Sequence, residues 1–212
     1  MKRRTAGFTL IEVLVAMTIM AVMAMMSWQG VDGIVRARDS SQGRLEQTLR
    51  LDSVVAQWEQ DLASIQESAA LPALLCDGSI VRLTRRAEGG MQVVAWALRP
   101  GAGSYTWWRW ASPIVTTVGE LQENWLRTQQ FQGGEPGQLR ALDGLASWQV
   151  YFYQGNTWSN CQSTGNIAVA PVAGASAAPT RVALPAGVRS VLEFAPGSGQ
   201  NGMLTRDTLL GP

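Results

Sequence analysis

The first long apolar run of the chain covers residues 8–26 and contains one charged residue, Glu12. A helix of about 19 residues rises roughly 28 Å, which is close to the hydrocarbon thickness of a bilayer. Residues 2–4 are all basic, and no acid stands between them and the run. Because basic residues stay on the cytoplasmic side of a membrane, the pattern predicts a single-pass helix with a cytoplasmic N-terminus and the rest of the chain outside.

The helical pattern continues past the apolar run. Apolar residues recur at helical spacing over residues 28–65, while charged residues, Asp61 among them, occupy other positions. We therefore expect an amphipathic helix over residues 27–70 that buries one face. An unbroken helix over residues 8–66 would be roughly 88 Å long, so its first half must serve something outside a globular domain. The glycines within residues 30–43 favour a kink or local melting there.

From Leu71 onward, apolar and polar residues alternate and turn sequences separate the alternating runs. The alternation predicts strands at residues 79–85, 91–98, 105–111, 147–153, 188–195 and 203–210. A short helix is expected at residues 118–130, a turn at 154–156 and a loop at 169–179.

A helix followed by strands predicts an α+β fold. In this fold the long N-terminal helix spans a membrane with its first half and packs its outer half on an antiparallel sheet. The sheet would be formed by residues 71–212, about 140 residues, which is enough to bury a proper core.

Composition excludes several classes of function. The chain has no histidine, so Ser-His-Asp and Cys-His triads, histidine-ligated zinc and histidine general bases are absent. Two cysteines cannot fill a four-thiolate metal site. The formal charge of +1, from 17 basic and 16 acidic residues, argues against a dedicated nucleic-acid binder. We expect no catalytic residues, no metal and no cofactor.

Glu12 is the anomaly of the apolar run. A carboxylate inside a membrane helix is costly unless it is paired, protonated or near the interface. A secretory signal peptide would need a small-residue cleavage site after the run, and none is present. A plain membrane anchor explains everything except Glu12. If the chain were cut between Gly7 and Phe8, the new amine and Glu12 would each need an opposite charge, which a neighbouring helix shifted along the axis can supply.

Residues 4–16 read RTAGFTLIEVLVA, which resembles the N-terminal signature of type IV pilins and type II secretion pseudopilins. The resemblance implies that a prepilin peptidase removes residues 1–7 after Gly7 and that Phe8 becomes N-methylated. It also implies that Glu12 pairs with a neighbouring subunit's amine during assembly. The expected fold is pilin-like, with the helix in the inner membrane and the head domain in the periplasm. The chain then divides into a leader (1–7), a membrane and assembly segment (8–26), an outer amphipathic helix (27–70) and a head (71–212).

Four further stretches resemble the J-type minor pseudopilins of type II secretion (the PulJ/GspJ family): residues 28–38, 51–62, 148–158 and 184–189. This resemblance implies a tip subunit of a periplasmic pseudopilus. Its partners would be the I-type and K-type minor pseudopilins and the major pseudopilin, without nucleic acid. The second hypothesis is a minor type IV pilin for adhesion, motility or DNA uptake. An anchored enzyme would need a polar catalytic cluster, which the sequence does not offer, and an anchored binding module would use the tryptophans as its platform.

Cys76 and Cys161 are the only cysteines, and both lie in the expected exported domain. An even number of cysteines in an oxidising compartment favours a disulfide, and two free thiols too far apart to join are the alternative. The nine tryptophans are expected mainly in the core. Trp107 and Trp108 are neighbours on one strand and should face opposite ways, so one of them is expected to be exposed.

Overall fold

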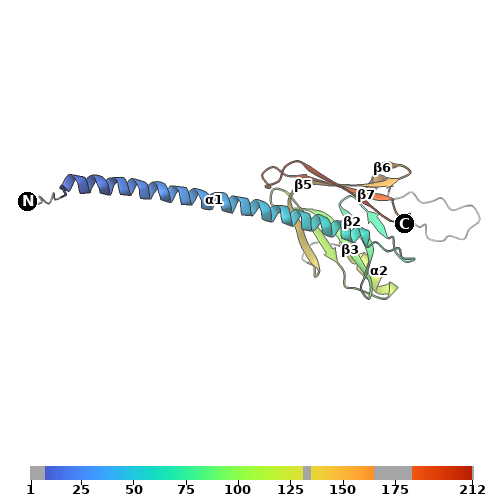
Figure 1. The fold of residues 1–212 in the computed structure, drawn as a ribbon. Coiled ribbons are helices and arrows are strands. Elements are labelled where there is room, and N and C mark those ends of the chain that lie inside the picture. Colours follow the sequence, from blue (N-terminus) through green and yellow to red (C-terminus); the bar gives the residue numbers. More distant parts are fainter. Residues whose placement is uncertain (1–7, 131–134, 165–182, 212) are drawn as a thin grey trace, which may run out of the picture. The chain divides into compact units, whose positions relative to one another are not determined.

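The computed structural model describes residues 8–130, 135–164 and 183–211 (Figure 1). These residues form two units, one up to Leu49 and one from Arg50 onward. The helices are α1 (Leu10–Ala63), α2 (Val118–Arg127), the 3-10 turn η1 (Thr128–Gln130) and α3 (Cys161–Thr164). The strands are β1 (Leu74–Cys76), β2 (Ile80–Ala87), β3 (Gly90–Pro100), β4 (Tyr105–Ala111), β5 (Gln138–Gln154), β6 (Thr157–Asn160), β7 (Gly187–Phe194) and β8 (Met203–Leu209).

The first unit consists of the N-terminal part of α1. The helix runs through Gly30, Gly33 and Gly43 without interruption, so the kink or melting expected there is not observed. A Cβ added at any of these glycines would meet nothing within 4 Å. The glycines therefore lower helix propensity without being required by a close contact.

The second unit is built on one eight-stranded antiparallel sheet in the order β1-β2-β3-β4-β5-β7-β8, with β6 also paired to β5. Strand β5 is 17 residues long, the longest strand of the sheet, and pairs with three other strands. Its first half pairs with β4, and its second half pairs with β6 and β7. Register shifts occur within β4 and near Leu145 of β5, and irregularities of this kind bend a strand.

The last turns of α1 pack on the inner face of this sheet, as Figure 1 shows. Four buried tryptophans from different elements, Trp58, Trp96, Trp107 and Trp148, form the centre of the core. Their contacting ring centroids lie 4.3–5.7 Å apart. Arg50 ties the start of this helical segment to β5 by donating to the carbonyl oxygens of Arg140 and Ala141 at 3.2 and 3.1 Å.

Asp61 lies in the last turn of α1 with 0% of its surface exposed. Its Oδ2 accepts hydrogen bonds from Arg109 Nε at 2.7 Å and Trp96 Nε1 at 2.9 Å. Its Oδ1 accepts from Arg109 Nη2 at 2.9 Å, Arg85 Nη1 at 2.8 Å and Gln57 Nε2 at 3.1 Å. The last turn of α1 carries no basic residue of its own, so the sheet arginines also offset the negative end of the helix dipole. Our placement of Asp61 on the polar side of the helix is therefore wrong.

A second apolar cluster lies on the opposite face of β2–β4 and is covered by α2. Thr117 caps α2: its hydroxyl oxygen accepts from the backbone N–H of Glu120, and its hydroxyl donates to the Glu120 carboxylate at 2.6 Å. Leu121 and Trp125 are the buried residues that α2 contributes to this cluster. The middle of the sheet is thus covered on both faces.

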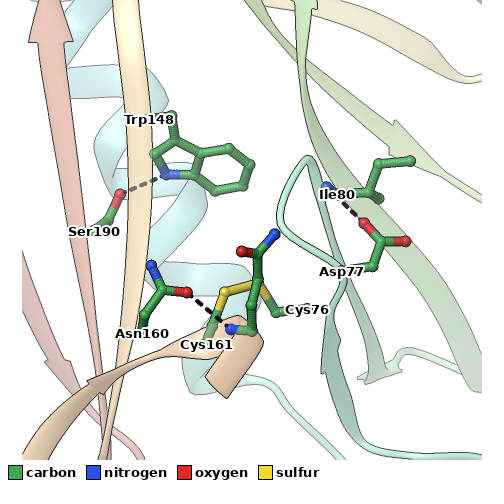
Figure 2. Close-up of a disulfide and its surroundings, with 8 residues drawn as sticks. Cys76, Asp77, Ile80, Trp148, Asn160, Cys161 and Ser190 are labelled. Atoms are coloured by element: carbon green, nitrogen blue, oxygen red, sulfur yellow. Dashed lines mark hydrogen bonds between the residues drawn. A yellow bond between two sulfur atoms is a disulfide. The ribbon is translucent and has the colours of Figure 1, made fainter. Parts of the chain in front are cut away.

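Cys76 and Cys161 are joined by a disulfide, with their Cα atoms 5.8 Å apart (Figure 2). Cys76 ends β1 at one edge of the sheet, and Cys161 begins α3 directly after β6. The bond therefore links the edge strand β1 to the segment that directly follows β6. The neighbouring turn requires Gly78, which has a φ of +90° and leaves room for the Gln162 side chain where a Cβ would collide with it.

The α+β class and the antiparallel sheet are confirmed. The strand expected at 105–111 has the observed bounds of β4, and the expected final hairpin corresponds to β7 and β8. The helix ends earlier than its periodicity indicated, because Ile65 pairs with Arg85 in an isolated bridge. The short strand β1 and the first half of β5 were not expected. The loop expected at 169–179 lies outside the described residues.

Replacing Asp61 by asparagine should lower the free energy of unfolding by about 3–5 kcal/mol, because the buried Arg109 would lose its counter-ion. The measurement is urea unfolding of the full chain in detergent, followed by tryptophan fluorescence. Asp52→Asn, at an exposed position of the same helix, is the matched control and should change stability by no more than about 0.5 kcal/mol. Equal stability of the two variants would show that the Asp61 network does not hold the helix to the sheet.

Replacing both cysteines by serine should lower the free energy of unfolding by roughly 4–5 kcal/mol on the chain-entropy model. The reason is that the bond closes a loop with a sequence separation of 85 residues. Alkylation of the unfolded chain, read by mass, should label neither cysteine before reduction and both after it. Full labelling without a reductant would contradict the bridge.

Candidate functional site

The N-terminal end of α1 forms a compact capping arrangement. Thr9 precedes the first helical residue, and Glu12 stands in the first turn. The Glu12 Oε2 atom accepts hydrogen bonds from the Thr9 backbone N–H at 2.9 Å and from the Thr9 hydroxyl at 2.8 Å. A carboxylate in the first turn is also favoured by the positive end of the helix dipole. Thr9 is absent from the expected site residues, although Thr-x-x-Glu ahead of an apolar run is the sequence pattern of a capping box.

The capping contacts use one oxygen of the Glu12 carboxylate. Within the described part of the chain, Oε1 has no hydrogen-bond partner. An ionised carboxylate has about four acceptor positions, so it can bind a further donor without releasing Thr9. The cap therefore orients the carboxylate and leaves capacity for a cation from another molecule.

The rest of the apolar run has its polar side chains satisfied internally. The Thr18 hydroxyl donates to the Leu14 carbonyl oxygen at 2.8 Å. The apolar side chains around it are exposed, as is Phe8, at 88%. A continuous apolar surface of this extent is not stable in water and needs lipid or protein to cover it. Glu12 is therefore the residue of this run with unused polar capacity.

In the described part of the chain, α1 is the single helix that is long and apolar enough to cross a membrane, and its apolar section lies near the N-terminus. This supports membrane anchoring by one helix. Phe8, the expected first residue after the cut, lies four positions before Glu12 in the sequence. Gly7, the expected residue before the cut, lies outside the described residues.

The head domain has its own polar groups, and most of them are paired inside the fold. Arg85 and Arg109 bind Asp61, and Arg82 binds Asp77 at 2.6 Å. No group of three or more metal-ligating side chains is arranged to hold a metal ion in residues 8–130, 135–164 and 183–211. Trp107 is fully buried and Trp108 is half-buried, so the expectation that one of the two is exposed is wrong.

A further ordered group lies on the outward face of β5–β8. The Arg189 guanidinium stacks over the Trp158 ring at 4.3 Å, and Trp158 contacts Tyr153 with ring centroids 5.2 Å apart. Arg189 also binds Asp207 through two hydrogen bonds of 2.7 and 2.6 Å. These hydrogen bonds hold the pKa of Asp207 below its usual value and raise the pKa of Arg189. Arg189 and Asp207 lie opposite each other on β7 and β8, so this pairing depends on the register of the final hairpin.

Comparison with known proteins bears on the N-terminal site. Residues 2–28 match the family model described as the prokaryotic N-terminal methylation motif. A search of curated proteins finds no match to the chain. The matched segment contains Gly7, Phe8 and Glu12 and the start of the exposed apolar helix. The motif and the helix–sheet fold together support a pilin-like protein of the type IV pilin and pseudopilin superfamily.

Proposed function

We propose that this chain is a minor pseudopilin of a type II protein secretion system, a structural subunit that helps to initiate the periplasmic pseudopilus at its tip. A prepilin peptidase cuts the chain after Gly7, and Phe8 is then N-methylated. The helix starts in the inner membrane, with its N-terminus cytoplasmic and its head periplasmic. It later leaves the lipid for a bundle of similar helices. The protein performs no catalysis in this role.

The observation that carries the proposal is the state of Glu12 in the apolar helix. The carboxylate is oriented by Thr9 and keeps one oxygen without a partner in the described part of the chain. Removal of the leader would create a cationic amine at Phe8, at the boundary of the same apolar helix. In a medium of low dielectric constant, an amine and a carboxylate attract strongly, so two such helices shifted along their axes would gain a pairing that lipid cannot provide.

The J-type assignment rests on four stretches of resemblance, and two of them supply residues on which the head depends. Residues 51–62 include Trp58 and Asp61, and residues 148–158 include Trp148. A J-type tip subunit would contact the I-type and K-type minor pseudopilins and the major pseudopilin. A minor type IV pilin is the second candidate, because the methylation motif is common to both groups. Whether the neighbouring genes encode secretion or pilus machinery would distinguish them.

Glu12→Ala, Glu12→Val and Glu12→Gln should all be processed normally, since the cleavage site is unchanged. Incorporation into the fibre should fall at least about tenfold, because the amine of the neighbouring subunit would lose its counter-charge. The measurement is recovery of each variant with the other subunits in a pull-down from the native host.

Thr18→Val is the matched control in the same helix. Its hydroxyl is already used by the Leu14 carbonyl oxygen, so its removal should leave assembly unchanged. Wild-type incorporation of the Glu12 variants would count against the assembly role. Equal losses in the Glu12 and Thr18 variants would indicate a general defect in helix packing instead.

N-terminal mass spectrometry of protein from its native host tests processing directly. The expected mature chain begins at Phe8 and carries a methyl group on its amine, whereas blocked cleavage would retain residues 1–7. Substitution of Gly7 by a bulky residue should leave the full-length band unshifted on a gel. Wild-type protein that retains its leader and still functions would instead favour an anchored binding module.

A further inference from the structure

The outer edge of β8 is the feature that the assembly of the N-terminal helix does not explain. β8 is the last strand in the sheet order and pairs with β7 along one side. Within residues 8–130, 135–164 and 183–211, no strand pairs with its other side. An unpaired strand side presents backbone N–H and C=O groups in a row, and such a row can accept a further strand.

The register identifies which backbone groups face outward. The Leu210 N–H donates to the Ala186 carbonyl oxygen, and the Phe194 N–H donates to that of Gly202, both at 3.0 Å. Hydrogen-bonded pairs recur every second residue in an antiparallel ladder. Continuing the ladder along β8, its even-numbered residues bond to β7. Its odd-numbered residues direct their N–H and C=O groups away from β7, and these are Met203, Thr205, Asp207 and Leu209.

Among the described residues, Arg206 is the one charge of this edge without an ion-pair partner, and the edge otherwise lacks the features that usually prevent strand addition. Protected edges are short, or carry charged side chains, above all lysine, or proline or a bulge. β8 is seven residues long and contains neither lysine nor proline, and its pairing with β7 has no register shift. Met203 and Leu209, at its two ends, are 73% and 83% exposed. Its single acid, Asp207, is bound by Arg189 and thus does not act as an unpaired charge that repels a strand.

The surface beside this edge has the residue types that dominate binding energy in protein interfaces, namely tryptophan, tyrosine and arginine. Arg189 is fixed between Trp158 and Asp207, so little side-chain freedom remains to be lost on binding. Contacts within the chain therefore already hold the Arg189 side chain beside the edge.

We propose that the outer edge of β8 binds an extended segment of a partner protein, which adds to the sheet as a further strand. The segment would carry apolar side chains opposite Met203 and Leu209. It would carry an acidic side chain opposite Arg206, which is exposed and has no ion-pair partner among the described residues. Backbone groups supply the affinity, and these three positions supply the specificity.

A second copy of this chain fits the edge less well than such a segment. Two β8 strands paired antiparallel about their middle would place the two Arg206 side chains opposite each other, and like charges in that position are destabilising. The proposal rests on the sheet alone, so it can fail or hold independently of processing at Phe8 and of Glu12.

The test uses the full chain in detergent and a capped peptide, Val-Thr-Thr-Glu-Thr-Thr-Val, which reads the same in both directions. At about 1 mM peptide, amide hydrogen exchange at Met203, Thr205, Asp207 and Leu209 should slow at least about threefold, since protection grows as 1 + [L]/Kd. The amides of the even-numbered residues should already exchange slowly without peptide, because they bond to β7.

Thr205→Pro removes an outward N–H without removing a bond to β7, so it should abolish the protection by peptide. Thr205→Ala keeps that N–H and is the matched control, which should behave as wild type. Should the proline variant fail to fold, Arg206→Glu provides a second test. It should weaken protection by the glutamate peptide and favour a peptide with lysine at the central position.

Three results would overturn the proposal. The odd-numbered amides could exchange at the same rate with and without peptide, which would show that the edge does not accept a strand. They could be protected in dilute protein without peptide, which would show that the edge is covered within the chain. Protection that rises with protein concentration alone would assign the edge to a second copy.

Discussion

An ionised carboxylate in an apolar helix needs a cation, and the helix of this chain contains none near Glu12. The helix end provides a partial answer, because Thr9 donates two hydrogen bonds to one carboxylate oxygen. Hydrogen bonds from neutral groups do not cancel a charge, so the Glu12 carboxylate still lacks a counter-ion. A subunit that begins with an amine at the same depth in the membrane would supply this counter-ion. Assembly would then depend on cleavage of the leader, which creates the amine.

The head domain also contains a carboxylate away from water, but its counter-ions come from the same domain. Asp61 is fully buried, and Arg85 and Arg109 from the sheet neutralise it within the fold. Removing one member would leave an uncompensated charge in the core, so the network fixes how the last turns of α1 lie on the sheet. Asp61 is thus neutralised within the head, whereas Glu12 has no cationic partner among the described residues.

The sequence predicts these features unequally, for physical reasons. Glu12 stands out because it is the sole charge in a long apolar run, and β4 because alternation is a local signal. Asp61 could not be placed correctly, since its burial depends on Arg85 and Arg109, which follow it by 24 and 48 residues. β5 was expected only in part. Its first half pairs with β4 across register shifts, and burial along this half does not alternate cleanly. The unpaired edge of β8 becomes visible only when the strand order is known.

Zero-length carbodiimide cross-linking of assembled fibres from the native host, analysed by mass spectrometry, tests whether Glu12 lies against the N-terminal amine of a neighbouring subunit. Lys2 is the only lysine in the sequence, so a chain cut after Gly7 has no amine except that of Phe8. We predict an amide bond between Glu12 and the N-terminal amine of a neighbouring subunit, absent from Glu12→Gln and unchanged in Asp52→Asn. Cross-linking of that amine to another carboxylate, with equal yield in the Glu12→Gln variant, would show that Glu12 is not its partner.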